Sequence, residues 1–293
     1  MIYVSSSCVK NNFIKESVLE LVKEGYKNIE ISGGTKYYDG YENDLLELKE
    51  KYELNYLVHN YFPPPKEPFI LNIASLNNEL YQKSIDHCLR AVKLCKLLGC
   101  KKYAIHAGFL IDFTPEEAGK KISLRKVNDR KDAIERFASA WEKIAEEAGD
   151  DVTLYIENNV YSQTNYATYE GNNPFLLTDY DGYIELSEKI NFTILLDLAH
   201  LKVSCNTLNL DFSNQSRQLM KQTDYFHVSG NDGLHDQNHG INHDIDVIGF
   251  LEGSDLSDKT LTLEIYNGLD SIRTSFEKLE LIISKAEIKK IQI

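Results

Sequence analysis

Short strand-like segments recur along the whole chain, and segments with helical periodicity separate them. Between residues 13 and 25, for example, Phe13, Val18 and Leu21 fall on one stripe of a helix, and Gly25 is a plausible stop. Eight alternations of strand and helix predict parallel strands with helical crossovers, which close into an α/β fold, a single (β/α)8 or TIM barrel. The eight predicted strands are residues 2–6, 28–32, 54–60, 102–107, 153–158, 193–198, 225–229 and 260–266.

The clearest helical segments are residues 13–25, 76–98, 131–147 and 269–286. The composition does not change along the chain, so we expect one domain spanning residues 1–293. An open doubly wound sheet is the alternative, but no GxGxxG or P-loop sequence follows the first strand. We therefore also expect no nucleotide cofactor.

Six of the predicted strands end in a residue that can bind a metal ion. The carboxyl ends of parallel strands in a closed barrel meet at one face, so these side chains should converge there. Imidazole and carboxylate groups together hold hard-to-borderline divalent cations. The six residues are His59, His106, Glu157, Asp197, His227 and Glu264. The sequence predicts a metal site at the C-terminal face of the barrel.

The last four of these ligands follow the fifth to eighth strands. Their oxygen-rich set, Glu157, Asp197, His227 and Glu264, suits Mn²⁺, Mg²⁺, Co²⁺ or Zn²⁺. Each could instead be a strand-end residue that caps a neighbouring helix, but that explanation would have to hold for all four at once.

The remaining histidines have several interpretations. His200 lies three residues after Asp197, which could direct both at one centre or let His200 reach a ligand beside the metal; packing under the barrel rim is the alternative. His59 and His106 could bind further metal ions or hydrogen-bond substrate hydroxyls. His87 lies within a helical segment, SIDHCLRAV, and we expect it to be structural.

Three long loops follow strands and should shape a substrate pocket: residues 61–72, 160–178 and 230–243. The first contains Pro63, Pro64 and Pro65, which stiffen the chain. The third is rich in ligand-type residues, so it could supply a second metal centre or be a solvated polar loop: Asp232, His235, Asp236, His239 and His243. Tyr61, Phe109 and Tyr266 each follow a predicted ligand and are expected to line the pocket.

The charge balance is acidic. Lys and Arg number 32 against 45 Asp and Glu, a net charge of −13, which argues against a nucleic-acid or anionic-membrane partner. The five cysteines form no CxxC pair and look like reduced, buried thiols. The first residues do not form a signal peptide, and no apolar run suggests a membrane span, so we expect a cytoplasmic protein. Self-association into a homo-oligomer is left open.

Several motifs taken together resemble the xylose isomerase-like TIM-barrel superfamily, which includes sugar isomerases and epimerases and the endonuclease IV-type AP endonucleases. The motifs are NIASLNNELYQKSIDHCLRAVKLCKLLGCKKYAIHAG, IENN, LLDLAH, FHVSGNDG and LEIYNG, and the resemblance covers nearly the whole chain.

In the isomerase branch, residues matching Glu157, Asp197, His227 and Glu264 hold one metal. The glutamates there exchange the substrate proton through a metal-stabilised enediolate, and the residue matching His200 contacts the sugar. The resemblance thus implies a metal-dependent sugar isomerase or epimerase with Glu157 and Glu264 as the catalytic pair. His59, His106, His200 and Tyr61 are expected to bind the substrate.

The AP endonuclease branch, with three zinc ions and nine ligands, is the alternative, and a dehydratase of the inosose type is another. This chain supplies candidates for seven of the nine zinc ligands, including His59, His106 and His200. The other two belong to a D-x-H motif, and the local match, Asp236–Gln237–Asn238–His239, departs from its spacing by one residue. The ketose epimerases carry an arginine shortly after the residue matching His227, which this chain lacks. The cations that could bind a phosphate group are Lys202 and Arg273.

Overall fold

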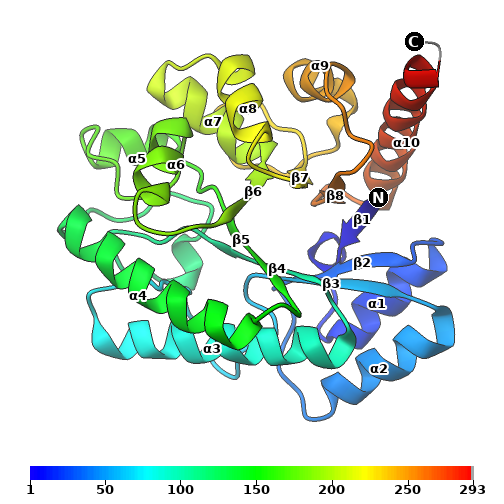
Figure 1. Cartoon of the computed structure of the whole chain (residues 1–293), viewed down its shortest axis with the longest axis horizontal. Helices are drawn as coiled ribbons and strands as arrows, with labels where there is room; N and C mark the ends of the chain where they lie inside the picture. Colours follow the sequence, from blue (N-terminus) through cyan, green and yellow to red (C-terminus); the bar gives the residue numbers. More distant parts are fainter. Residues whose placement is uncertain (292–293) are drawn as a thin grey trace.

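The computed structural model describes the backbone of residues 1–291 and shows a closed barrel of eight parallel strands. The strands are β1 (Ile2–Ser5), β2 (Asn28–Ile31), β3 (Asn55–His59), β4 (Lys102–His106), β5 (Thr153–Glu157), β6 (Thr193–Asp197), β7 (Tyr225–Val228) and β8 (Thr260–Leu263). Each strand pairs with its neighbours in chain order, and β1 closes the barrel against β8, with Tyr3 opposite Thr262. All eight predicted strands and the (β/α)8 architecture are confirmed (Figure 1).

Helices surround the strands (Figure 1). They are α1 (Ile14–Lys23), α2 (Tyr41–Tyr52), α3 (Asn78–Leu98), α4 (Arg130–Ala148), α5 (Gln163–Thr168), α6 (Tyr180–Ser187), α7 (Leu198–Leu208), α8 (Phe212–Met220), α9 (Ile245–Glu252) and α10 (Leu269–Ile291), with 3-10 turns η1 (Ser6–Cys8), η2 (Pro115–Glu117) and η3 (Ile241–His243). The four predicted helices are confirmed. The loop predicted over 160–178 contains the short helix α5, which begins where Ser162 accepts a hydrogen bond from the backbone of Asn165.

The boundaries of α3 show how local chemistry sets a helix. The side chain of Asn77 accepts hydrogen bonds from the backbone N–H groups of Glu79 and Leu80, so the helix begins two residues later than its apolar pattern suggested. At the other end Gly99 adopts φ +68°, a left-handed conformation that glycine takes without strain. No helix among residues 1–291 is long and apolar enough to cross a membrane. The five cysteines are buried and form no disulfide.

A layer of six buried side chains fills the barrel interior: Tyr3, Leu57, Ala104, Tyr155, Leu195 and Tyr225. Side chains alternate along a strand, so the residue two positions further on faces the interior again. Five of the predicted ligands stand two positions beyond a member of this layer: His59, His106, Glu157, Asp197 and His227. The period of the strands thus places a polar layer directly above an apolar one.

His87 lies on α3 and is completely buried, with its ring edge-on to Phe69 at a centroid distance of 5.6 Å. Neither ring nitrogen has a hydrogen-bond partner among the described residues. Burial, aided by the charge of Arg90, lowers the pKa of His87 to about 3. These contacts support the structural role expected for His87.

This burial predicts a pH-dependent stability. An unfolded chain takes up the His87 proton near pH 6.5 and the folded protein only near pH 3, so the unfolded state binds more protons between these values. The free energy of unfolding should therefore fall as the pH drops through this window, by at most about 1.4 kcal/mol per pH unit. His87→Leu removes the titration, and urea unfolding at pH 7 and pH 5 should show a larger advantage for the variant at pH 5. An equal difference at both pH values would contradict this account.

Candidate metal centre

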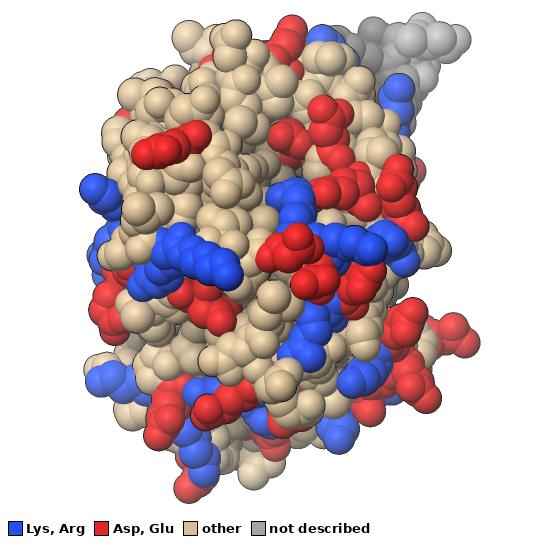
Figure 2. All heavy atoms as spheres, turned by 90° about the vertical axis from the view of Figure 1, so that its left-hand side faces the viewer, with Lys and Arg blue, Asp and Glu red and all other residues tan. Residues whose placement is uncertain are grey.

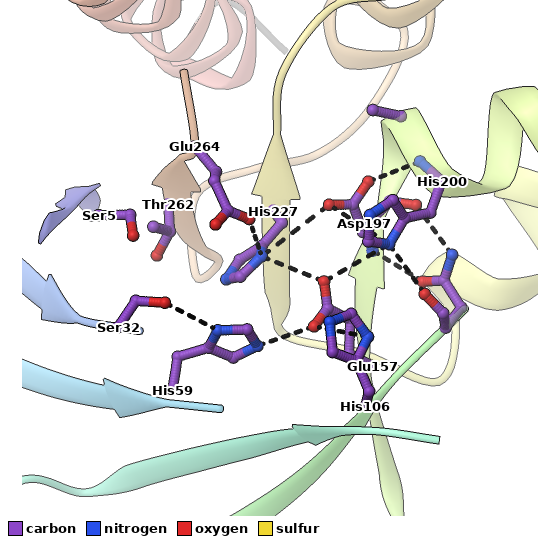
Figure 3. Close-up of polar contacts among 12 residues, drawn as sticks. Ser5, Ser32, His59, His106, Glu157, Asp197, His200, His227, Thr262 and Glu264 are labelled. Carbon is purple, nitrogen blue, oxygen red and sulfur yellow. Dashed lines mark hydrogen bonds and ion pairs between the residues drawn. The ribbon is translucent and has the colours of Figure 1, made fainter. Parts of the chain in front are cut away.

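The fully buried carboxylate of Glu157, at the end of β5, lies among four histidines (Figure 3). Its Oε2 is 2.7 Å from Nε2 of His59 and 3.3 Å from Nδ1 of His106. Its Oε1 is 3.3 Å from Nδ1 of His227 and 3.6 Å from Nδ1 of His200. One carboxylate thus connects side chains from β3, β4 and β7 with the first turn of α7.

The four predicted metal ligands are brought together. Glu157, Asp197, His227 and Glu264 each offer one ligand atom within 4.8 Å of the others. Nδ1 of His227 lies 3.3 Å from Oε2 of Glu264 and 3.9 Å from Oδ2 of Asp197. Asp197 also caps α7, because its Oδ1 accepts the backbone N–H of His200 at 2.7 Å. Helix capping therefore accounts for one oxygen of Asp197 and leaves the other directed at the cluster.

Several polar atoms in this cluster have no hydrogen-bond partner among the described residues, although all are buried. They are Oε1 of Glu157, Oδ2 of Asp197, Nδ1 of His227 and Nδ1 of His106. A buried polar atom without a partner is costly, and the three on Glu157, Asp197 and His227 lie in one ligand group and call for a common partner. A cation placed among carboxylate oxygens and imidazole nitrogens would satisfy them. The residues therefore fit a divalent metal ion.

The charges of the cluster are strongly coupled. Burial would raise the pKa of Glu157, but the charges of His106, His59 and His227 outweigh it and hold that pKa well below its usual range. Burial would likewise raise the pKa of Glu264, but the close contact with His227 lowers it to about 2. Both glutamates are therefore ionised at neutral pH and can act as ligands or bases.

Burial disfavours the charged forms of Asp197 and His106. Burial raises the pKa of Asp197 to about 6, and the neighbouring charge of Glu157 adds to the effect. Burial lowers the pKa of His106 to about 4, so its ring is neutral at neutral pH and keeps a lone pair for a cation or a donor.

A second group of potential ligands adjoins the first. His106, Glu157 and His200 each offer an atom within the same 4.8 Å limit. Nε2 of His200 lies 3.6 Å from Oδ2 of Asp236, so one acid of the 230–243 loop reaches the site. His239 is exposed, and its backbone pairs with Gly230.

The other ligand-type residues of this loop belong to neither ligand group, although His235 lines a cavity beside the site. His235 is exposed and lies 2.8 Å from Asp232, and His243 is also exposed. The buried ammonium of Lys202 holds the loop, because it lies 2.8 Å from Asp244 and donates to the carbonyl of Asn231 at 3.2 Å. The ammonium of Lys202, one of the two cations that could have served a phosphate group, is therefore paired within the loop.

Sequence reasoning missed Glu30, a fully buried acid in the middle of β2. Its carboxylate lies 3.0 Å from Nε2 of His227 and accepts hydrogen bonds from Thr262 at 2.9 Å and from the hydroxyl of Tyr225. His227 thus presents Nε2 to Glu30 and Nδ1 to the cluster. A proton held on Nε2 leaves the Nδ1 lone pair for a metal. The available signal was a charge within an apolar strand, NIEI.

Glu30→Gln should weaken metal binding although residue 30 offers no ligand atom to the first set. Glutamine keeps the shape but removes the charge that fixes the ring of His227. Second-sphere partners of this kind are worth roughly 10- to 100-fold in metal affinity. Chelator competition for Co²⁺, followed through its visible absorption, measures the change. Glu185→Gln, which alters the ion pair with Arg130, is the matched control. Equal affinity in wild type and Glu30→Gln would refute the assigned role.

The cluster opens into two adjoining cavities. One, of about 470 Å³, is lined by polar side chains that include His59, Asn60 and Glu264. The other, of about 200 Å³, has one wall of phenylalanine and isoleucine side chains, and mostly polar residues line the rest of it. Tyr61 lines both cavities, Phe109 the apolar one and Tyr266 the polar one, as expected. The hydroxyls of Tyr266 and Ser7 donate to Oε1 of Glu264 at 2.6 and 3.1 Å.

Comparison with solved structures shows the same architecture in sugar epimerases and in a nuclease. A D-tagatose 3-epimerase-like protein matches with a TM-score of 0.72 and 18% identity over 98% of both chains. An L-ribulose 3-epimerase matches with a TM-score of 0.66 and 17% identity over 98% of this chain and 97% of the other. Endonuclease IV from Thermus thermophilus matches with a TM-score of 0.62 and 15% identity over 97% and 99%. At these identities the similarity shows the fold.

Comparison of the sequence with curated proteins and family models identifies a relative and a family. The probable endonuclease 4 of Sulfurihydrogenibium sp. (strain YO3AOP1) is 27% identical over 178 residues, or 60% of this chain and 54% of that protein. The chain thus spans about half the length of this relative. The model of one family, described as xylose isomerase-like TIM barrel, matches residues 18–282. Since that match covers most of the chain, the protein belongs to the xylose isomerase-like TIM-barrel family.

Proposed function

We propose that the protein is a divalent-metal-dependent isomerase or epimerase of a sugar or sugar derivative. The observation that carries the proposal is the set of unpartnered buried atoms on Glu157, Asp197, His227 and His106 beside a polar cavity. Sugar hydroxyls need many hydrogen-bond partners, and this cavity offers imidazole, amide and hydroxyl groups. The epimerases among the similar structures support the same interpretation.

Glu157, Asp197, His227 and Glu264 would hold the metal. When bound, a divalent cation would polarise a substrate carbonyl and stabilise the negative charge that develops on it. Glu264 and Glu157 then have the protonation state that a base requires, since both are ionised at neutral pH. One glutamate, as the carboxylate, would remove the proton from the carbon beside the carbonyl. The other would take up a proton from solvent and deliver it to the opposite face or to the neighbouring carbon, and the first would then release its proton to solvent.

The remaining polar side chains orient the substrate. Ser7 and Tyr266 donate to one oxygen of Glu264, which fixes the direction of its carboxylate. His59, His106 and His200 border the polar cavity and would hydrogen-bond sugar hydroxyls, together with Tyr61. These residues position the carbon that loses its proton, and a misplacement of about 1 Å is enough to cost a large part of the rate.

Incubation of the metal-loaded protein with a panel of ketoses and keto-sugars in deuterated water tests the proposal. We expect deuterium at the carbon next to the carbonyl, detected by NMR, at a rate that depends on the metal. Elemental mass spectrometry should find close to one divalent metal ion per chain. Metal binding without exchange into any sugar would overturn the proposal.

A zinc-dependent AP endonuclease or phosphodiesterase is the second candidate. The sequence similarity to the probable endonuclease 4 favours it, as does the second group formed by His106, Glu157 and His200 near Asp236. The net charge of −13 disfavours a nucleic-acid substrate. Figure 2 also shows acidic and basic side chains interspersed on the face that it presents. Two or three zinc ions per chain and cleavage of a duplex with an abasic site would establish this activity instead.

A further inference from the structure

A small apolar cluster lies apart from the barrel core, on loops that follow β3, β4 and β5 and on the ligand side of the barrel. Its buried members are Ile70, Phe109, Ile111, Ile122, Tyr161, Tyr169 and Phe175. Phe113 packs against it and is only partly buried. Loops on this face usually carry polar residues that meet solvent, so a concentration of phenylalanine and isoleucine there needs an explanation.

The apolar cluster forms one wall of the smaller cavity, which we call the apolar lobe. The lobe has a volume of about 200 Å³, and this wall consists of Ile70, Phe109, Phe113, Ile122 and Phe175. The rest of the lining is mostly polar, but the amides of Asn159 and Asn165 are already hydrogen-bonded to the backbone. Aromatic rings form much of this wall: Phe109 lies edge-on to Phe113 at 4.9 Å and to Phe175 at 5.9 Å between centroids. A surface of this kind accepts a planar ring better than a hydrated chain.

The apolar lobe adjoins the metal centre. It shares Tyr61, His106, His200 and Asp236 with the polar cavity, and His106 and His200 also belong to the second ligand group. A group bound in the lobe therefore lies beside His106 and His200, two of the three members of the second ligand group.

A free hexose does not match this arrangement. It carries an oxygen on every carbon, and a hydroxyl placed against phenylalanine and isoleucine would lose its hydrogen bonds to water without gaining others. We propose that the substrate is a sugar derivative with an apolar, ring-sized substituent, and that this substituent occupies the apolar lobe. This inference rests on the proposed function only in assigning a sugar to the polar cavity.

The outer edge of the lobe is basic. Lys120 and Lys121 line it, and both side chains are exposed; Lys120 donates to the backbone carbonyl of Glu116 at 3.1 Å. The cations therefore border the lobe on its solvent side, while the phenylalanines form its wall. The ring itself contacts the apolar wall.

Metal chelators test the lobe without any assumption about the sugar. Acetohydroxamate, benzohydroxamate and 3-phenylpropionohydroxamate differ only in the group beyond the chelating atoms. With the Co²⁺-loaded protein, calorimetric titration should show at least one aryl compound binding about 10-fold more tightly than acetohydroxamate, or better. Phe113→Ser should remove most of this preference. Phe212→Ser, which replaces an aromatic residue that lines neither cavity, should keep it.

Equal affinity for the alkyl and aryl hydroxamates would overturn the inference, as would a preference that survives Phe113→Ser. A pair of sugars then connects the lobe to the activity: the methyl and phenyl glycosides of the same 3-keto-glucose. We expect faster deuterium exchange with the phenyl compound at low concentration. An aryl preference among hydroxamates together with no exchange into any sugar would retain the lobe and refute the proposed function. Deuterium exchange into a sugar without an aryl preference among the hydroxamates would support the proposed function and refute the role of the lobe.

Discussion

Glu157→Gln is expected to abolish both metal retention and turnover. The carboxylate of Glu157 lies within 3.6 Å of nitrogen atoms on four histidines, and no other described side chain belongs to both of the ligand groups that surround it. Glutamine removes the charge and places an amide N–H₂ where a cation would bind. We expect metal affinity to fall at least ~100-fold and turnover at least ~1,000-fold.

Elemental mass spectrometry after gel filtration measures the metal lost, and solvent-deuterium exchange measures the turnover. Glu53→Gln is the matched control, because it makes the same chemical change in an exposed ion pair with Lys27. Wild-type metal content in Glu157→Gln would remove Glu157 from the metal site. Wild-type exchange would remove it from the catalytic pair.

Glu264→Gln is expected to separate catalysis from metal binding. Three predicted ligands, Glu157, Asp197 and His227, remain, so the protein should still bind metal, with lower affinity. The base at position 264 is lost, however, and general-base catalysis contributes roughly 10²- to 10⁴-fold. We expect exchange to slow by about that factor while metal added in excess restores occupancy but not the rate.

The comparison requires both quantities in one sample: metal per chain and deuterium exchange per bound metal. Tyr266→Phe is an informative partner variant, since it removes the hydroxyl that donates to Glu264 and leaves the carboxylate. It should slow exchange less than Glu264→Gln does. An unchanged rate per bound metal in Glu264→Gln would show that Glu264 is a ligand without a role in proton transfer.

The barrel could be predicted from the alternation of strand and helix segments, and most of the site from the residues at the strand ends. His59, Glu157 and Asp197 end their strands two positions beyond a buried interior residue, so the strand pattern fixes both their height and their direction. Glu30 also faces the interior, but it lies inside its strand. In so short a strand, the sequence pattern does not show whether an acidic residue faces the barrel interior or a surrounding helix. Only the hydrogen bonds from Tyr225 and Thr262 reveal the environment of Glu30.

The 230–243 loop could not be predicted in the same way. A loop has no repeating pattern, and its side-chain directions depend on distant contacts such as that between Lys202 and Asp244. As a result Asp236 reaches His200, whereas His239, three residues later, is exposed. The apolar lobe was equally hidden, since Phe109 and Phe175 are far apart in the chain and meet only in the folded barrel.

The cluster draws its members from nearly the full circumference of the barrel, from Glu30 on β2 to Glu264 just after β8. Because the cluster needs residues from both ends of this range, a metal ion at the cluster would bind the closed barrel and not the unfolded chain. By mass action, each tenfold rise in free metal above the dissociation constant should then add about 1.4 kcal/mol to the free energy of unfolding. A growing chain would likewise capture its metal only after β8 has left the ribosome. If the site binds a metal as we propose, metal occupancy would thus report complete folding.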